Sequence, residues 1–124
     1  MDKLKHIGRI VFALPFLVFG INHFIYAPMM AGLVPSYVPG GVFWVYITGA
    51  GLIAASVSVA ANRLVKISGL LLALLLLLFV LTIHIPGLGN PQMAQMAMIG
   101  LLKDTAMMGA AIMASAFFGN WEKK

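Results

Sequence analysis

The chain lacks cysteine and has only three acidic residues among its 124. Without cysteine it cannot carry a disulfide, a thiolate metal site or a thiol–disulfide relay of its own. Charged residues make up 9% of the sequence, whereas they make up about 25% of an average soluble domain. Because 62% of the residues are hydrophobic and the mean hydropathy is +1.03, this scarcity of charge predicts an integral membrane protein.

The eight lysines and arginines outnumber the acids and give a formal net charge of +5. A basic surplus can indicate nucleic-acid binding when it forms a patch interleaved with exposed aromatic residues. Here the basic residues instead flank long apolar runs, where they are expected to define membrane topology. We therefore expect no nucleic-acid partner, and the lipid bilayer is the predicted surrounding.

Four apolar runs are long enough to cross a hydrocarbon core of about 30 Å, which takes about 20 residues in a helix. They cover about 7–26, 42–60, 65–85 and 98–118. This pattern predicts one all-α domain over residues 1–124, an antiparallel four-helix transmembrane bundle. The leucine-rich stretch LLLALLLLLF in the third run is expected to face lipid over much of its circumference.

The distribution of the basic residues predicts the orientation. Seven of the eight lie in the N-terminal arm, in the turn between the second and third spans, and in the C-terminal tail. The positive-inside rule then places both termini in the cytoplasm and the other two loops outside. The first apolar run lacks a convincing small-x-small cleavage site, so we expect a retained helix rather than a signal peptide. The predicted location is the plasma (inner) membrane, with several spans.

Asp104 is the one acid away from the chain ends. A charge at membrane depth costs roughly 3 kcal/mol on insertion scales and usually faces a bundle interior, a partner or a water-filled cavity. His23, Tyr46 and His84 lie near the predicted outer ends of the first three spans, and Asp104 lies about two turns inside the fourth. These positions predict a pocket in the outer half of the membrane, with His23, His84 and Asp104 as the chemically active groups.

Three uses of such a pocket remain open from the residues alone. Two imidazoles and a carboxylate can bind a divalent metal if all three converge. The same groups can exchange protons with a quinone. Two histidines can also ligate haem, although their placement at helix ends makes a porphyrin hard to enclose.

The apolar, aromatic-rich surroundings favour the second use, a quinone or a similar small redox ligand, and we predict no metal. Three further residues are candidates to contact such a ligand: Tyr46, Lys103 and Asn22. Adjacent positions on a helix point about 100° apart, so Asn22 and Lys103 need not share the direction of His23 and Asp104.

The chain resembles the DoxX family of small four-span membrane proteins. The resemblance is carried by the GxxHF pattern at Gly20 to Phe24, by the VP...P...WVYITG pattern that follows, and by the Lys–Asp pair in LLKDTAMMGAA. It covers roughly residues 4–118, and the matching positions are His23, Tyr46, His84, Lys103 and Asp104. It implies a four-helix bundle and a role as membrane subunit of an oxidoreductase that handles sulfur compounds and quinones. Since cysteine is absent, sulfur chemistry would need a partner subunit or a non-covalent substrate.

Another hypothesis is non-enzymatic: a membrane scaffold or assembly factor in which the histidines and Asp104 form a structural latch. Either kind of protein can act with a partner subunit or as a homo-oligomer. A transporter is a weaker alternative, because the sequence shows no inverted repeat and no polar residue in the inner half comparable to Asp104.

Overall fold

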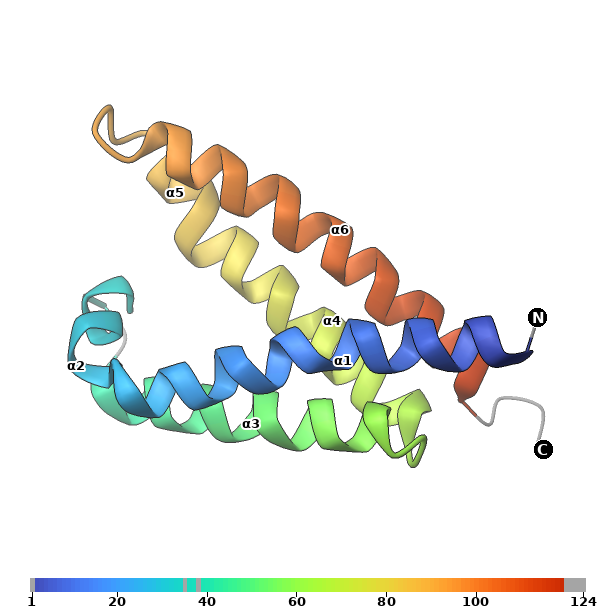
Figure 1. Ribbon diagram of the computed structural model, residues 1–124. Coiled ribbons are helices and arrows are strands. Elements are labelled where there is room, and N and C mark those ends of the chain that lie inside the picture. The colour runs from blue at the N-terminus through green and yellow to red at the C-terminus, as the bar shows by residue number, and fades with distance from the viewer. Residues whose placement is uncertain (1, 35, 38, 120–124) are drawn as a thin grey trace.

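The computed structural model of the chain describes residues 2–34, 36–37 and 39–119 (Figure 1). Its long helices are α1 (Asp2–Ile25), α3 (Val42–Ala60), α4 (Val65–Phe79) and α6 (Ala94–Phe118). Helix α4 continues through a π-helical turn, η2 (Val80–His84), into the short α5 (Ile85–Gly87). Two short elements, α2 (Ala27–Met30) and η1 (Ala31–Leu33), lie in the first loop. The described residues thus form four helical segments long and apolar enough to cross a membrane, which confirms the all-α, four-span prediction.

The helix bounds differ from the predicted spans mainly at two ends. The second span was predicted at its observed bounds, whereas α1 already begins at Asp2 and α6 at Ala94. Hydropathy underestimates the length of both helices, because their first turns contain polar residues that are nevertheless good helix formers, such as Lys3, Lys5 and Gln95.

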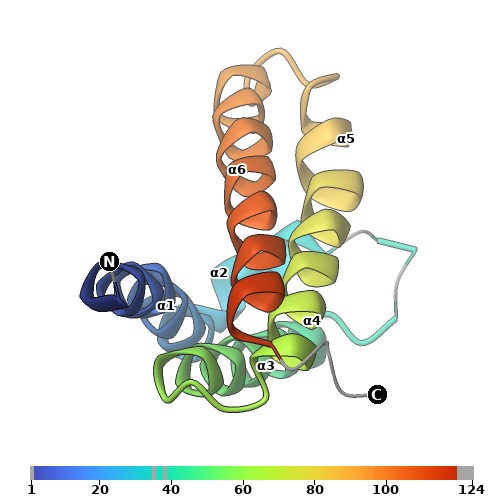
Figure 2. The ribbon, with the colours of Figure 1, turned by 90° about the vertical axis from the view of Figure 1, so that its right-hand side faces the viewer.

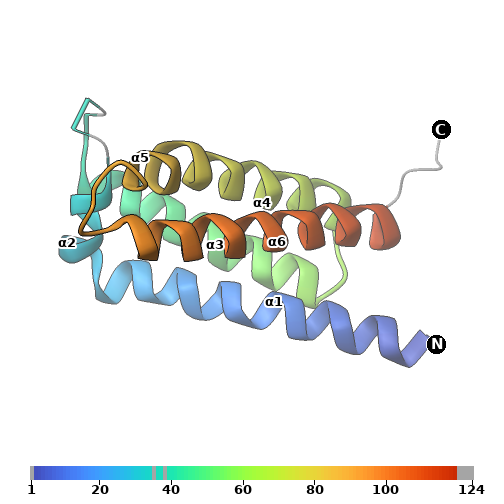
Figure 3. The ribbon, with the colours of Figure 1, turned by 90° about the horizontal axis from the view of Figure 1, so that it is seen from above.

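The four spans are arranged as two antiparallel pairs. Helix α1 packs along α3, and α4 packs along α6, while α4 also contacts α3. Figure 1 shows that the pairs lie close where α1 begins and α6 ends, and diverge toward the loops that contain α2 and α5. The same two pairs are seen from the side in Figure 2 and from above in Figure 3.

Glycine residues allow the two helices of each pair to approach closely. A Cβ atom on Gly20 would lie 2.8 Å from the backbone oxygen of Gly49, and a Cβ on Gly49 would lie 3.0 Å from that of Gly20. On the other pair, a Cβ on Gly69 would lie 2.9 Å from the backbone oxygen of Ala111. Small residues of this kind permit close backbone approach between membrane helices. Each pair therefore packs as a unit.

The main core lies where the two pairs meet. Its buried residues come from all four long helices: Phe16, Leu52, Leu72, Ala73, Leu76 and Ala111. The leucine-rich stretch of α4 is accordingly two-sided. Leu72 and Leu76 are buried, but the other face is exposed, at Leu70, Leu71, Leu74, Leu77 and Leu78. The buried side arises because α4 contacts both α3 and α6. Contact of the exposed side with lipid, expected over much of the circumference, stays a prediction.

Candidate ligand-binding site

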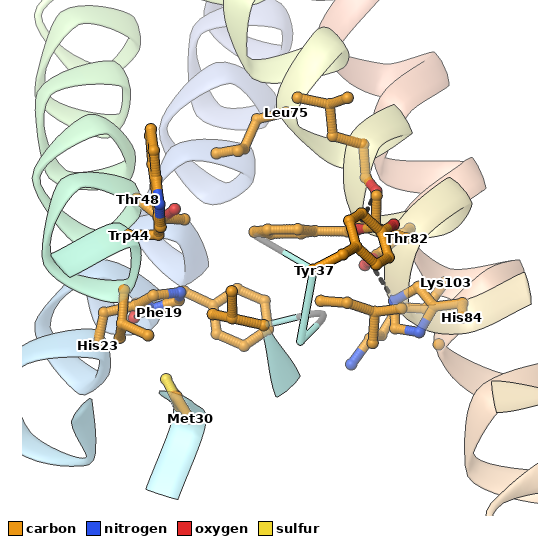
Figure 4. A pocket seen from close by; sticks show the side chains of 17 residues that line it. Phe19, His23, Met30, Tyr37, Trp44, Thr48, Leu75, Thr82, His84 and Lys103 are labelled. Atoms are coloured by element: carbon orange, nitrogen blue, oxygen red, sulfur yellow. Dashed lines mark hydrogen bonds and ion pairs between the residues drawn. The ribbon is translucent and has the colours of Figure 1, made fainter. Parts of the chain in front are cut away.

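A cavity of about 440 Å³ lies between the two diverging helix pairs (Figure 4). Pockets for small organic ligands typically span about 300–1,000 Å³ and have mostly apolar walls with a few polar groups. The apolar and aromatic lining consists of Phe19, Met30, Val34, Tyr37, Trp44, Val45, Leu75, Leu78, Phe79 and Ile83. The polar side chains that line it are those of His23, Thr48, Thr82, His84, Lys103 and Asp104. This composition suits a largely apolar molecule with a small number of polar atoms.

The structure brings His84 and Asp104 into direct contact. The imidazole Nε2 of His84 lies 2.7 Å from Oδ2 of Asp104, and the carboxylate accepts a hydrogen bond from it. Asp104 is 5% exposed. Burial of a carboxylate is costly unless it is hydrogen-bonded and paired. The lone acid of the spans is therefore stabilised by a histidine from the neighbouring segment of the same helix pair.

His84 is the last residue of a local change in helix geometry, the π-helical turn η2. In η2 the backbone N–H of Ile85 donates to the oxygen of Val80, five residues earlier, instead of four. Pro86 follows and has no N–H, so it cannot donate to the carbonyl of Thr82 as an α-helix would require. A π-turn contains one extra residue, which changes the direction of the side chains around it, and such turns occur frequently at functional sites. Here the turn lies where the third span packs against α6.

Gly100 provides the space that the imidazole of His84 occupies. A Cβ at Gly100 would lie 2.5 Å from Cε1 and 2.6 Å from Nδ1 of His84. Gly100 precedes Asp104 by four residues, so both lie on the same face of α6. Sequence reasoning missed this residue, although a glycine one turn before a buried acid on an apolar helix is a recognisable signal.

His23 lies on the opposite wall of the cavity from His84 (Figure 4). Its Nδ1 lies 2.7 Å from the backbone oxygen of Phe19, to which it donates. In a neutral imidazole this leaves Nε2 as an acceptor. Gly49 of α3 packs closely against the side chain of His23, since a Cβ at Gly49 would lie 2.6 Å from Cβ of His23. Packing against α3 thus limits the positions open to this ring.

The three predicted active groups share one cavity but do not form one cluster. His84 and Asp104 are bonded, whereas His23 belongs to the other helix pair. Within the described residues, no three His, Asp or Glu side chains are grouped so that they could hold a metal ion. The arrangement therefore gives no support to the divalent-metal alternative, which required all three to converge.

Of the other predicted contacts, only Lys103 lines the cavity. Its Nζ lies 5.7 Å from the centroid of the Phe19 ring on α1. Tyr46 instead stacks on Phe24, with ring centroids 5.5 Å apart, and Asn22 is half-buried outside the lining. Tyr46 and Asn22 therefore lie outside the lining, since neighbouring helix positions point about 100° apart, and their contact with a ligand stays a prediction.

The second span contributes two residues that sequence reasoning missed. Trp44 and Thr48 both line the cavity, and they are four positions apart on one face of α3. Trp44 also donates its indole N–H to the backbone oxygen of Pro39, which fixes the ring to the first loop. The spacing of four residues between Trp44 and Thr48, which places them on one helix face, was the feature of the sequence that could have indicated a shared wall.

Four membrane-length helices around a ligand-sized cavity with a buried His–Asp pair define a small multi-pass helical membrane protein. The chain belongs to the family described as "Domain of unknown function (DUF8561)", whose family model matches residues 12–114. Comparison with curated proteins gave no match, and comparison with solved structures gave none either.

The family match overturns the resemblance to the DoxX family. The residues behind that resemblance were short patterns set in apolar helices. Such helices share composition across unrelated membrane proteins, because every span must satisfy the same bilayer. The oxidoreductase role that the resemblance implied loses that support, and function has to be argued from the site.

Proposed function

We propose that this protein lies in the plasma membrane with both ends of its chain in the cytoplasm. The support is the distribution of basic residues under the positive-inside rule. The ligand cavity, which lies toward α2 and α5, then belongs to the outer half of the membrane.

This orientation can be tested cleanly because the chain has no cysteine. A single cysteine introduced as Gln92→Cys, in the loop before α6, is expected to react with a membrane-impermeant maleimide on intact cells. The matched variant Arg63→Cys, in the turn between α3 and α4, is expected to react only after lysis. Labelling of Arg63→Cys but not Gln92→Cys on intact cells would reverse the topology.

We further propose that the cavity binds a quinone or a similar small redox ligand, and that the protein acts as a membrane subunit of an oxidoreductase system. The observation that carries this proposal is a buried His84–Asp104 pair in the wall of an apolar, aromatic-lined cavity of about 440 Å³. A quinone needs apolar walls for its ring and a few polar groups for its oxygens, which matches this lining.

The pair and His23 have separate roles in this proposal. Asp104 holds the imidazole of His84 in one orientation, as a carboxylate does for a general acid or base. His23, on the opposite wall, presents its Nε2 for the second oxygen of the ligand. Because a quinone takes up protons as it takes up electrons, such groups can supply or accept the protons. The electrons come from a partner subunit.

Binding of decylubiquinone to the purified protein tests this function. Wild type is expected to bind it, and His23→Phe is expected to weaken binding about tenfold, the effect of losing one hydrogen bond of about 1.4 kcal/mol. Asp104→Asn keeps a hydrogen-bond acceptor for His84 but removes the charge, and is also expected to weaken binding. Tyr46→Phe is the matched control, because Tyr46 lies outside the cavity. Absence of binding to wild type, or equal effects of His23→Phe and Tyr46→Phe, would refute the proposal.

The scaffold alternative is favoured by a specific observation: Asp104 already has a partner within the chain, and that bond links η2 to α6. In this alternative the pair is a latch that presents the bundle to a partner protein. Asp104→Ala should then lower the melting temperature in detergent and abolish co-purification of the partner, while Asp104→Asn retains both and decylubiquinone changes neither. Stabilisation of wild type by decylubiquinone would decide against the latch.

A further inference from the structure

A second cavity, also of about 440 Å³, lies between α1 and α6 at the end of the molecule opposite the first. One part of its lining is cationic, from Lys5 and Arg9. The remainder is apolar and includes Phe12, Met113 and Phe117. The ligand site already described does not include any of these residues.

The cationic part is built around the ring of Phe118. The Arg9 guanidinium carbon lies 5.5 Å from the ring centroid, and Nζ of Lys5 lies 6.0 Å from it. Arg9 also donates through Nη1 to the backbone oxygens of Val59 and Ala60, at the C-terminal end of α3. These contacts hold its positive charge in one place. Its Nε is buried and has no hydrogen-bond partner among the described residues.

The apolar part follows the helices into the membrane-spanning segments. Small residues of both helices line this part of the groove, Gly8 on α1 and Ala110 and Ala114 on α6, and they leave room between the larger side chains. A Cβ at Gly8 would have no atom within 4 Å, so this wall of the groove is open. The groove thus combines a cationic end with an apolar remainder that lies between two membrane-length helices. A ligand that fits it needs an anionic group and an attached apolar chain.

We propose that this groove binds an anionic phospholipid, with its phosphate at Lys5 and Arg9 and an acyl chain along Phe12, Met113 and Phe117. Each lysine or arginine near the membrane surface raises the affinity for anionic lipids about fivefold. A free phosphate would meet only the cationic end, and a zwitterionic lipid would match the charge less well. The proposal does not depend on the quinone proposal, because the two cavities share no residue.

Native mass spectrometry of the purified chain, with phosphatidylglycerol or phosphatidylcholine added, tests this site. Wild type is expected to retain one phosphatidylglycerol and to prefer it over phosphatidylcholine. Gly8→Leu is expected to abolish retention by filling the groove, with Gly109→Leu on α6 as the matched control, since a Cβ there also has no atom within 4 Å. Lys5→Gln is expected to weaken retention about fivefold, whereas Lys3→Gln, which lies outside the lining, leaves it unchanged.

Competition with inorganic phosphate separates the two sources of a phosphate group. If inorganic phosphate at equal concentration displaces the bound phosphatidylglycerol, the site belongs to a soluble anion and the lipid proposal is wrong. Equal retention of both lipids, or equal retention by Gly8→Leu and Gly109→Leu, would also overturn it. Co-purification of a protein that Gly8→Leu removes, without any bound lipid, would show that the groove is a protein interface instead.

Discussion

Replacing His84 by leucine is expected to reduce the free energy of unfolding by about 3 kcal/mol. The substitution removes the donor that lies 2.7 Å from Oδ2 of Asp104 and leaves a buried carboxylate without this partner. Breaking a buried pair by removing one member typically costs about 3–5 kcal/mol, much of it the penalty of the stranded charge. Unfolding in mixed micelles with increasing SDS, followed by circular dichroism, measures the change.

The double variant His84→Leu/Asp104→Leu is the control for this prediction. Removing both partners leaves neither member of the pair buried without the other, so we expect the double variant to be more stable than His84→Leu alone. A double-mutant cycle with the single variants His84→Leu and Asp104→Leu isolates the coupling between the two side chains. If the two single effects simply add, the pair is not coupled and the site does not function as a unit.

Gly69→Ala is expected to destabilise the protein by about 1–3 kcal/mol, the usual cost of overpacking. The added Cβ would lie 2.9 Å from the backbone oxygen of Ala111 and 2.9 Å from Cβ of Ser115. Because the first of these is backbone, α4 and α6 must move apart to accommodate the methyl group. The same SDS titration reads out the loss.

Gly51→Ala is the matched control on α3, because a Cβ at Gly51 has no atom within 4 Å. An exchange of glycine for alanine inside a helix normally stabilises it by roughly 0.5–1 kcal/mol. The two substitutions are therefore expected to have opposite signs. Equal signs would contradict the close approach of α4 and α6, and with it the support that this pair gives to His84.

Much of the fold could be predicted from the sequence. The four spans follow from the length of the apolar runs, because a helix must be about 20 residues long to cross the bilayer and must satisfy its own backbone. Asp104 was identified as exceptional because a charge is costly at that depth. These are properties of composition and of single segments, and they do not depend on which helices are neighbours.

The partners within the site could not be predicted in the same way. His23, Tyr46 and His84 all lie near the ends of spans, but depth does not say which way a side chain points. In the structure His84 contacts Asp104, His23 lies across the cavity, and Tyr46 packs on Phe24 outside it. Family membership also could not be read from short patterns in apolar helices.

The sequence by itself therefore determined that this is a four-span membrane protein with one carboxylate in need of a partner. Only the tertiary structure decided that the partner is His84, that Gly100 makes room for it, and that a cavity separates the pair from His23. The reason is that the rotation of each helix about its axis is set by packing between helices. In this protein that packing depends on the close approach at Gly20, Gly49 and Gly69, whose neighbours come from distant parts of the chain.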